Sequence, residues 1–121
     1  MHFQVINDNY YNGIIEKIDK FFPTFNSVFS KDDGVYPILG ELGTYIINNF
    51  KNETIKKSSI DFINEAIEKG GSETEDAIVL QLFQKFYENN TLVVQIREML
   101  HSKALFVFDK YNESEILNNI I

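Results

Sequence analysis

Glu98 and His101 stand three residues apart in a stretch expected to be helical. This E-x-x-H spacing places a carboxylate and an imidazole on one helix face, as in di-iron helical bundles. Such a site needs a second E-x-x-H, and the only other histidine is His2. We therefore predict no metal site, and we interpret His101 as a residue that suits the negative end of a helix dipole.

Asp32 and Asp33 form an adjacent pair of carboxyl groups, which is a residue type that can transfer protons. Adjacent acids in a polar loop are usually a solvated surface, because charged side chains are seldom buried. The chain has no G-x-S-x-G, H-E-x-x-H, phosphate-binding loop or G-x-G-x-x-G. We predict that the protein is not an enzyme and uses no cofactor.

The composition narrows the class of protein further. The chain has 121 residues, no cysteine and a formal net charge of −7, which predicts one domain without disulfides. It has no apolar run long enough for a membrane span and no secretory signal, so we expect it in the cytoplasm. Phosphate binding needs clustered Lys and Arg, and the only basic cluster is Lys51, Lys56 and Lys57 beside Glu53. Direct nucleic-acid binding is not expected.

The first 35 residues predict one clear helix. Apolar spacing indicates a helix from about Tyr10 to Phe22, and Pro23 should end it. Phe25, Val28 and Phe29 are expected to fold back on the core as a short helical turn. Residues 1–7 fit a frayed end or a short strand equally well, and residues 31–34 form a loop by composition.

The organising element is a helical hairpin over Tyr36–Lys69. Its first helix carries Gly40 and Gly43 on one side, which predicts close approach of another backbone. Its second helix begins between Thr54 and Ser59, with Ser58 and Asp61 spaced like a capping box, and Gly70-Gly71 should end it in a left-handed conformation.

The remaining chain predicts three further helical segments. Ser72 and Glu75 form a capping arrangement ahead of a mostly buried helix over 76–88. A helix over 92–100 follows. Residues 104–108 suit a buried strand or a helix, and without a partner strand we favour a helix over 102–112, with one more turn in the tail after residue 113.

The predicted fold class is all-α, with five to six antiparallel helices. The hairpins 36–69 and 74–110 recur at a spacing within the range of HEAT or tetratricopeptide repeats. An irregular bundle is the alternative, because the two units differ in sequence.

An up-down arrangement would bring the start of helix 36–50, the end of helix 58–69 and the start of the helix after Gly71 to one end. We name the carboxylates expected there the acidic edge; they are Asp32, Asp33, Glu41, Glu68, Glu73, Glu75 and Asp76. Charge of one sign attracts a complementary partner. Helix capping and a solvated rim explain the same residues without any partner.

Several segments resemble a family of small, acidic, helical bacterial proteins: FPTF, YPILGELGTYIINNF, DFINEAIEKGGSETEDAIVLQLF and REMLHSKAL. The positions that carry the resemblance are core and capping residues, namely Gly40, Leu42, Tyr45, Phe62, Ile63, Ala66, Ile67 and Gly70. The chain departs from the pattern at His101-Ser102, where Gly-Pro is expected, which leaves the start of the last helix open.

The family looks like the immunity proteins of bacterial toxin systems, including contact-dependent inhibition. The resemblance implies a cytoplasmic inhibitor that binds a cognate toxin domain, commonly a basic nuclease, and covers its active site. The alternative hypothesis is a helical adaptor without a toxin partner.

Overall fold

The computed structural model describes residues 7–120, and the side chains of residues 7–113. This part of the chain is all-helical and contains no strand, which confirms the predicted fold class. The predicted count of five to six helices is slightly low. The prediction for residues 1–7 falls almost entirely outside the described residues.

The elements in chain order are α1 (Asn9–Asn12), α2 (Ile14–Phe21), η1 (Lys31–Asp33), α3 (Val35–Asn48), α4 (Glu53–Lys69), α5 (Ser72–Ile78), η2 (Val79–Phe83), α6 (Gln84–Phe86), α7 (Asn90–Met99) and α8 (Ser102–Ile120). Here η1 is a 3₁₀ turn and η2 is a π-helical turn.

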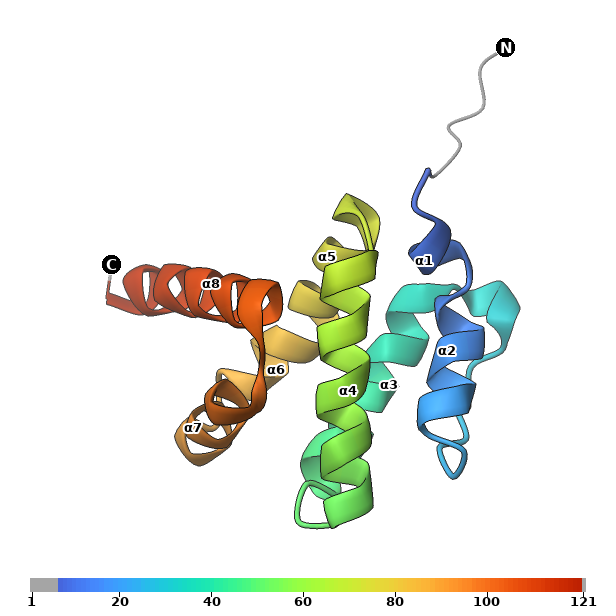
Figure 1. Ribbon diagram of the computed structural model, residues 1–121, viewed down its shortest axis with the longest axis horizontal. Coiled ribbons are helices and arrows are strands. Elements are labelled where there is room, and N and C mark those ends of the chain that lie inside the picture. The colour runs from blue at the N-terminus through green and yellow to red at the C-terminus, as the bar shows by residue number, and fades with distance from the viewer. Residues whose placement is uncertain (1–6, 121) are drawn as a thin grey trace.

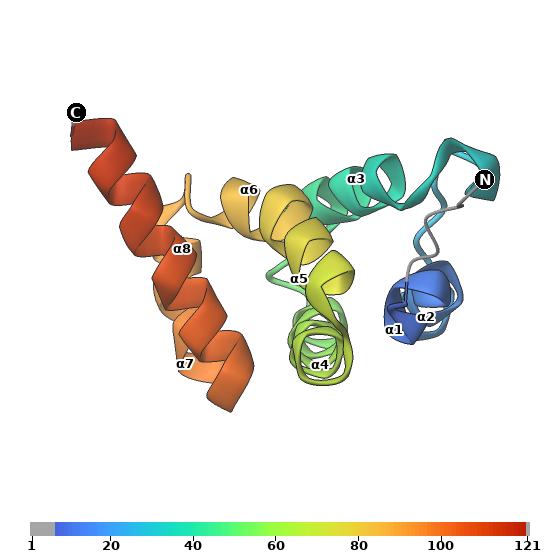
Figure 2. The same ribbon diagram turned by 90° about the horizontal axis from the view of Figure 1, so that it is seen from above.

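The helices form two uneven layers and not a stack of parallel hairpins. Figure 2 shows α3, α5 and α6 along one side of the molecule and α1, α2, α4 and α7 along the other. The long helix α8 lies beside α4 at a steep angle to it, as Figure 1 shows. The irregular-bundle alternative therefore describes the fold better than a helical repeat does.

The N-terminal helix is broken at Gly13 into α1 and α2, where we predicted one helix. The segment from Phe22 to Ser30 is not helical. Phe25 reaches the core as predicted, but Val28 is 84% exposed and Phe29 is 42% exposed, so the prediction that they fold back was wrong. Apolar character alone did not place them, because the chain there runs over the surface.

Gly43 confirms the predicted close approach of another backbone, whereas the nearest neighbour of Gly40 is a side chain. A Cβ on Gly43 would lie 2.9 Å from the backbone oxygen of Gln81, and one on Gly40 would lie 2.8 Å from the Gln81 side chain. Gln81 belongs to η2, and α5, η2 and α6 follow one another without a break as one continuous helical segment. Lys85 donates from Nζ to the Gly40 carbonyl oxygen and to Thr44 Oγ1, which ties the two segments together.

Both predicted capping boxes were wrong. α4 begins at Glu53, one residue before the predicted range of Thr54 to Ser59, and its cap is Asn52, whose Oδ1 accepts a hydrogen bond of 3.1 Å from the Ile55 amide. α5 begins at Ser72, so this serine is the first helical residue and not the cap. Gly70 does end α4, but its φ of −80° is extended and not left-handed.

Residues 104–108 lie inside α8, which confirms the helix over the strand. Helix α8 also continues through the segment for which we predicted only one further turn. Arg97 of α7 binds Asp109 of α8 through two hydrogen bonds, of 2.6 Å from Nε and 2.9 Å from a terminal nitrogen.

The ring contacts of the single hydrophobic core fall into two groups. Phe22 packs edge-on against Phe62 with ring centroids 5.8 Å apart. Phe83 packs edge-on against Phe108 at 4.9 Å, and the Tyr87 hydroxyl donates to the Phe108 carbonyl oxygen at 2.8 Å. These contacts hold the end of α2 to α4, and α8 to η2.

Candidate functional site

Asp8 connects α1 to the start of α5, which carries Glu73, Glu75 and Asp76 of the acidic edge. Its side chain is buried and accepts hydrogen bonds from the amides of Tyr11 at 3.1 Å, Gly71 at 2.9 Å and Thr74 at 2.8 Å. One carboxylate therefore caps α1 and, across more than 60 residues of sequence, the first turn of α5.

The charge of Asp8 is stabilised by these contacts. Burial raises the pKa of the Asp8 carboxyl group, but the amides of Thr74, Tyr11 and Gly71 outweigh burial and leave the pKa below its ordinary value. Asp8 is therefore an anion that the fold uses internally, and it is not part of the charge offered to a partner.

Two members of the acidic edge lie beside two tyrosines. Burial raises the pKa of the Tyr36 phenol, and nearby Tyr11, Asp76 and Glu73 raise it further. Burial also raises the pKa of Tyr11, with the charges of Glu73 and Asp8 adding to it. Glu73 and Asp76 are themselves exposed, so the start of α5 presents carboxylates next to half-buried aromatic rings.

Two other members have partners within the fold. Glu41 accepts hydrogen bonds from Ser27 Oγ at 2.6 Å and from the Val28 amide at 3.1 Å, so it holds the segment before η1. Asp33 accepts from the Ser30 amide at 2.8 Å. Asp32 is exposed on the same 3₁₀ turn and has no hydrogen-bond or ion-pair partner among the described residues.

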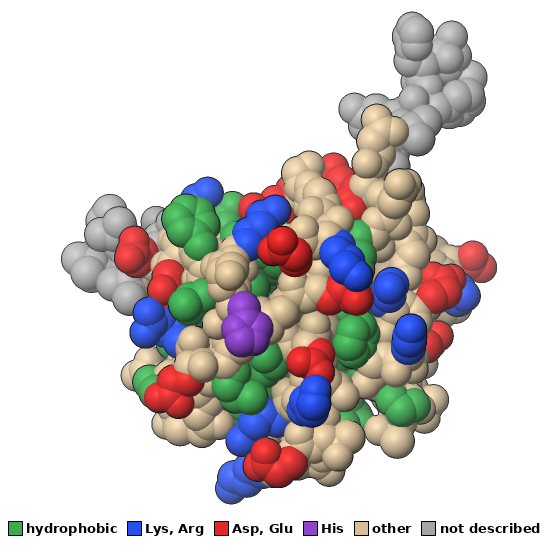
Figure 3. Space-filling view, in the orientation of Figure 1, with side chains coloured by type: hydrophobic (Ala, Val, Ile, Leu, Met, Phe, Trp, Pro, Cys, Tyr) green, Lys and Arg blue, Asp and Glu red, His purple; other side chains and the backbone are tan. Residues whose placement is uncertain are grey.

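Glu68 is exposed near the end of α4, and Glu75 is half-buried in α5. Figure 1 shows η1, the first turn of α3, the end of α4 and the start of α5 all in the upper part of the molecule. In Figure 3, acidic and basic side chains are interspersed over the visible face, including its upper margin. Among the members of the acidic edge, Glu73 and Asp76 are the clearest pair of exposed carboxylates at this end of the molecule. That the acidic edge binds a partner stays a prediction.

Sequence reasoning missed Asp8, Tyr11 and Tyr36. Asp8 directly precedes the first helix, which is a recognisable cap position. Its second role had no sequence signal, because nothing local links residue 8 to residues 71 and 74. The tyrosines lie in segments that we predicted to be helical, and no role was assigned to their rings.

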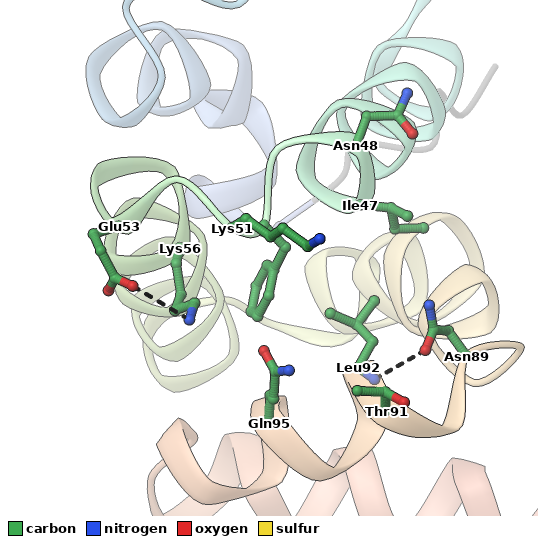
Figure 4. Close-up of a pocket in the computed structure, with 10 residues that line it drawn as sticks. Ile47, Asn48, Lys51, Glu53, Lys56, Asn89, Thr91, Leu92 and Gln95 are labelled. Carbon is green, nitrogen blue, oxygen red and sulfur yellow. Dashed lines mark hydrogen bonds and ion pairs between the residues drawn. The ribbon is translucent and has the colours of Figure 1, made fainter.

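The opposite end of α4 contains a cavity of about 560 Å³. Its walls come from the end of α3, the α3–α4 turn, the start of α4 and the start of α7, as Figure 4 shows. Lys51 and Lys56 line it, whereas Lys57 pairs with Asp61 outside it at 2.6 Å. The basic cluster of the sequence is thus divided between a cavity and a solvated helix face.

Among the residues that the structure describes, no three His, Cys, Asp or Glu side chains are grouped so that they could hold a metal ion. No helix in the same part of the chain is both long enough and apolar enough to cross a membrane. The chain matches no protein-family model, no curated protein and no solved structure.

Proposed function

We propose that this chain is a non-catalytic inhibitor of the immunity type, which acts in the cytoplasm on a cognate toxin with a basic toxin domain and covers its active site. The observation that carries the proposal is the pair of exposed carboxylates Glu73 and Asp76 at the start of α5, a helix that contacts both α1, which holds Tyr11, and α3, which holds Tyr36. The proposal includes neither nucleic acid nor a membrane as a partner.

This combination suits a basic protein surface for two physical reasons. Carboxylates of one sign speed the approach of a basic partner and orient it. Tyrosine provides a large contact area with few rotatable bonds, and it is enriched among the residues that carry binding energy. The net charge of −7 adds a long-range attraction to the local one.

Asp8 makes this corner a preorganised surface. Because it caps α1 and α5 together, Tyr11 and Glu73 are held on one rigid unit. A rigid edge loses little conformational entropy on binding, which favours tight association.

The test is binding of the toxin domain encoded beside this gene, measured by calorimetry at low and physiological salt. The double variant Glu73→Lys with Asp76→Lys should weaken binding about tenfold or more, since rim charges contribute to association and like charges oppose it. Asp19→Lys with Glu88→Lys makes the same change in net charge at exposed positions outside the acidic edge, so it is the matched control.

Equal losses in the two double variants would mean that net charge alone matters, and the acidic edge would be excluded as the contact surface. Failure of the wild-type chain to bind the neighbouring gene product would overturn the immunity proposal itself. Circular dichroism of all variants checks that the fold is intact.

A helical adaptor with a less charged partner is the second candidate function. It is favoured by apolar side chains left exposed in the C-terminal half, where Phe106 is 69% exposed and Val94 is 57% exposed. Phe106→Ser should abolish binding of such a partner and leave the binding of a basic toxin domain unchanged.

A further inference from the structure

The cavity at the lower end of α4 differs in charge from the rest of this acidic protein. Two lysines line it, and Glu53 is the only acid among its lining residues. Glu53 lies 3.6 Å from Lys56 with its own side chain 86% exposed, so it neutralises that lysine only weakly. Lys51 has no hydrogen-bond or ion-pair partner in the described part of the chain. The lining of the cavity is therefore positively charged, although the whole chain has a net charge of −7.

The helix ends around the cavity add to this charge. α4 and α7 both begin at its wall, and the first turn of a helix carries a partial positive charge. α3 ends at the same place, and its negative end offsets one of these two. The three helix dipoles together thus add a small positive potential at the cavity. This potential adds to the charge of the lysines, but it would not make a binding site alone.

The walls of the cavity have an apolar part and a polar part. Phe50, Leu92 and Ile47 provide apolar surface, and the amino group of Lys56 lies 5.5 Å from the centre of the Phe50 ring. In Figure 4, Lys51 extends from the α3–α4 turn across the opening, and Leu92 and Gln95 point toward the same space from α7. A cavity of about 560 Å³ has the size of an ordinary small-molecule site.

We propose that this cavity binds a small organic anion, in which a phosphate or carboxylate group contacts Lys51 and Lys56 and an apolar body packs on Phe50 and Leu92. The lysines supply charge-assisted hydrogen bonds, and the Gln95 amide supplies a neutral donor. The site is independent of the proposed toxin contact, because it lies at the other end of α4 from Glu73 and Asp76.

The test titrates the full chain with four probes and follows backbone amide signals by NMR. Phenyl phosphate and benzoate carry both required groups, inorganic phosphate lacks the apolar body, and phenol lacks the charge. Phenyl phosphate or benzoate should shift the amides of residues 51–56 and 89–95, and should bind at least about tenfold more tightly than phenol or inorganic phosphate. Comparison of the first two probes distinguishes a phosphate ligand from a carboxylate ligand.

Variants locate the charge that binds. Lys51→Met with Lys56→Met should weaken phenyl phosphate binding about tenfold or more, because it removes both charged donors and keeps the side-chain length. Gln95→Glu should weaken it as well by placing a negative charge at the cavity. Lys57→Met is the matched control, since it makes the same change on the same helix outside the cavity.

The proposal is overturned if Lys57→Met weakens binding as much as the double variant does, or if the shifted amides lie elsewhere. It is also overturned if phenol binds as well as phenyl phosphate, because the charge would then have no role. Should the double variant fail to fold, Lys51→Met alone decides the question, since Lys51 is exposed and holds no other element.

Discussion

The helices that begin at the two ends of α4 are capped in different ways. At the lower end, Asn52 caps α4 through the Ile55 amide at 3.1 Å, and Asn89 caps α7 through the Leu92 amide at 3.0 Å. Each capping asparagine lies three residues before the residue whose amide donates a hydrogen bond to it. At the upper end, α5 has no local cap, and Asp8 supplies one from the far N-terminal side.

The difference shows that a helix end can depend on a neighbour in sequence or on a neighbour in space. A local cap needs only its own few residues, so it stabilises one helix. The Asp8 cap exists only when α1, the α4–α5 junction and the core are all in place. Stability should therefore be shared unevenly between the two ends, and variants can measure how unevenly.

The largest effect is expected for Asp8→Ala. The change leaves the amides of Tyr11, Gly71 and Thr74 without their acceptor, so the free energy of unfolding should fall by about 2–4 kcal/mol. Urea unfolding followed by circular dichroism measures the loss. A loss smaller than that of a single local cap would show that water replaces Asp8 at little cost. The expected difference in stability between the two ends of α4 would then be contradicted.

Gly70→Ala should be next in size. A Cβ at this position would lie 2.5 Å from both the Ala66 carbonyl oxygen and the Thr74 Cβ, and neither atom moves without moving a helix. We expect a loss of about 1–3 kcal/mol, as for overpacking of a core. Gly13→Ala is the matched control, because its nearest neighbour would be at 3.8 Å. Equal stability of the two variants would contradict a tight junction.

Asn52→Ala and Asn89→Ala should each lower the free energy of unfolding by about 1 kcal/mol, the usual value of one side-chain cap. The two losses should add, because the caps serve different helices. Thermal unfolding of the single and double variants tests this. Strong non-additivity would mean that the lower end is as interdependent as the upper one.

The smallest effect should come from acid. The pKa of Asp8 is lowered in the folded protein, so its charge stabilises the fold above the unfolded-state pKa of about 3.9, and this stability is lost as the pH falls through the folded-state pKa. Protonation keeps most of the side chain in place, so the change is smaller than that of Asp8→Ala. The fall in urea midpoint from pH 7 to below about pH 4 should be smaller in Asp8→Asn than in the wild type. Glu65 also has a lowered pKa, so Glu65→Gln is measured beside it. An identical fall in Asp8→Asn would show that the Asp8 charge does not matter.

The same contrast explains what the sequence predicts well. Hydrophobic spacing predicted the helices and the all-α class, because the pattern of each helix lies within that helix. The glycine spacing in α3 predicted the close approach of another backbone but did not identify it, and the structure shows that it is the backbone of Gln81. The capping predictions at Ser58 and Ser72 were wrong, because both serines fit a capping pattern while the caps are Asn52 and, for α5, the distant Asp8.

The candidate site was predicted only in part. Placing the ends of α3 to α5 together followed from the order of short connections, and α3 and α5 are in contact in the structure. That Glu73 and Asp76 form part of a binding site stays a prediction. The internal roles of Glu41 and Asp33 depend on the path of a loop, which spacing does not specify. The cavity with Lys51 and Lys56 arises where α7 meets the α3–α4 turn, and no single segment contains that information.

The π-helical turn η2 has a consequence for how this chain tolerates changes in length. A π turn holds about one residue more than an α turn, so it is the shape that an α-helix takes when one residue is inserted and both flanks keep their packing. Leu80 lies in this turn and is 52% exposed, whereas Val79, Leu82 and Phe83 are buried. Deleting Leu80 is therefore expected to give a regular helix from Ser72 to Phe86 that still folds, while deletion of a residue within α3 or α4 would rotate every later side chain away from the core.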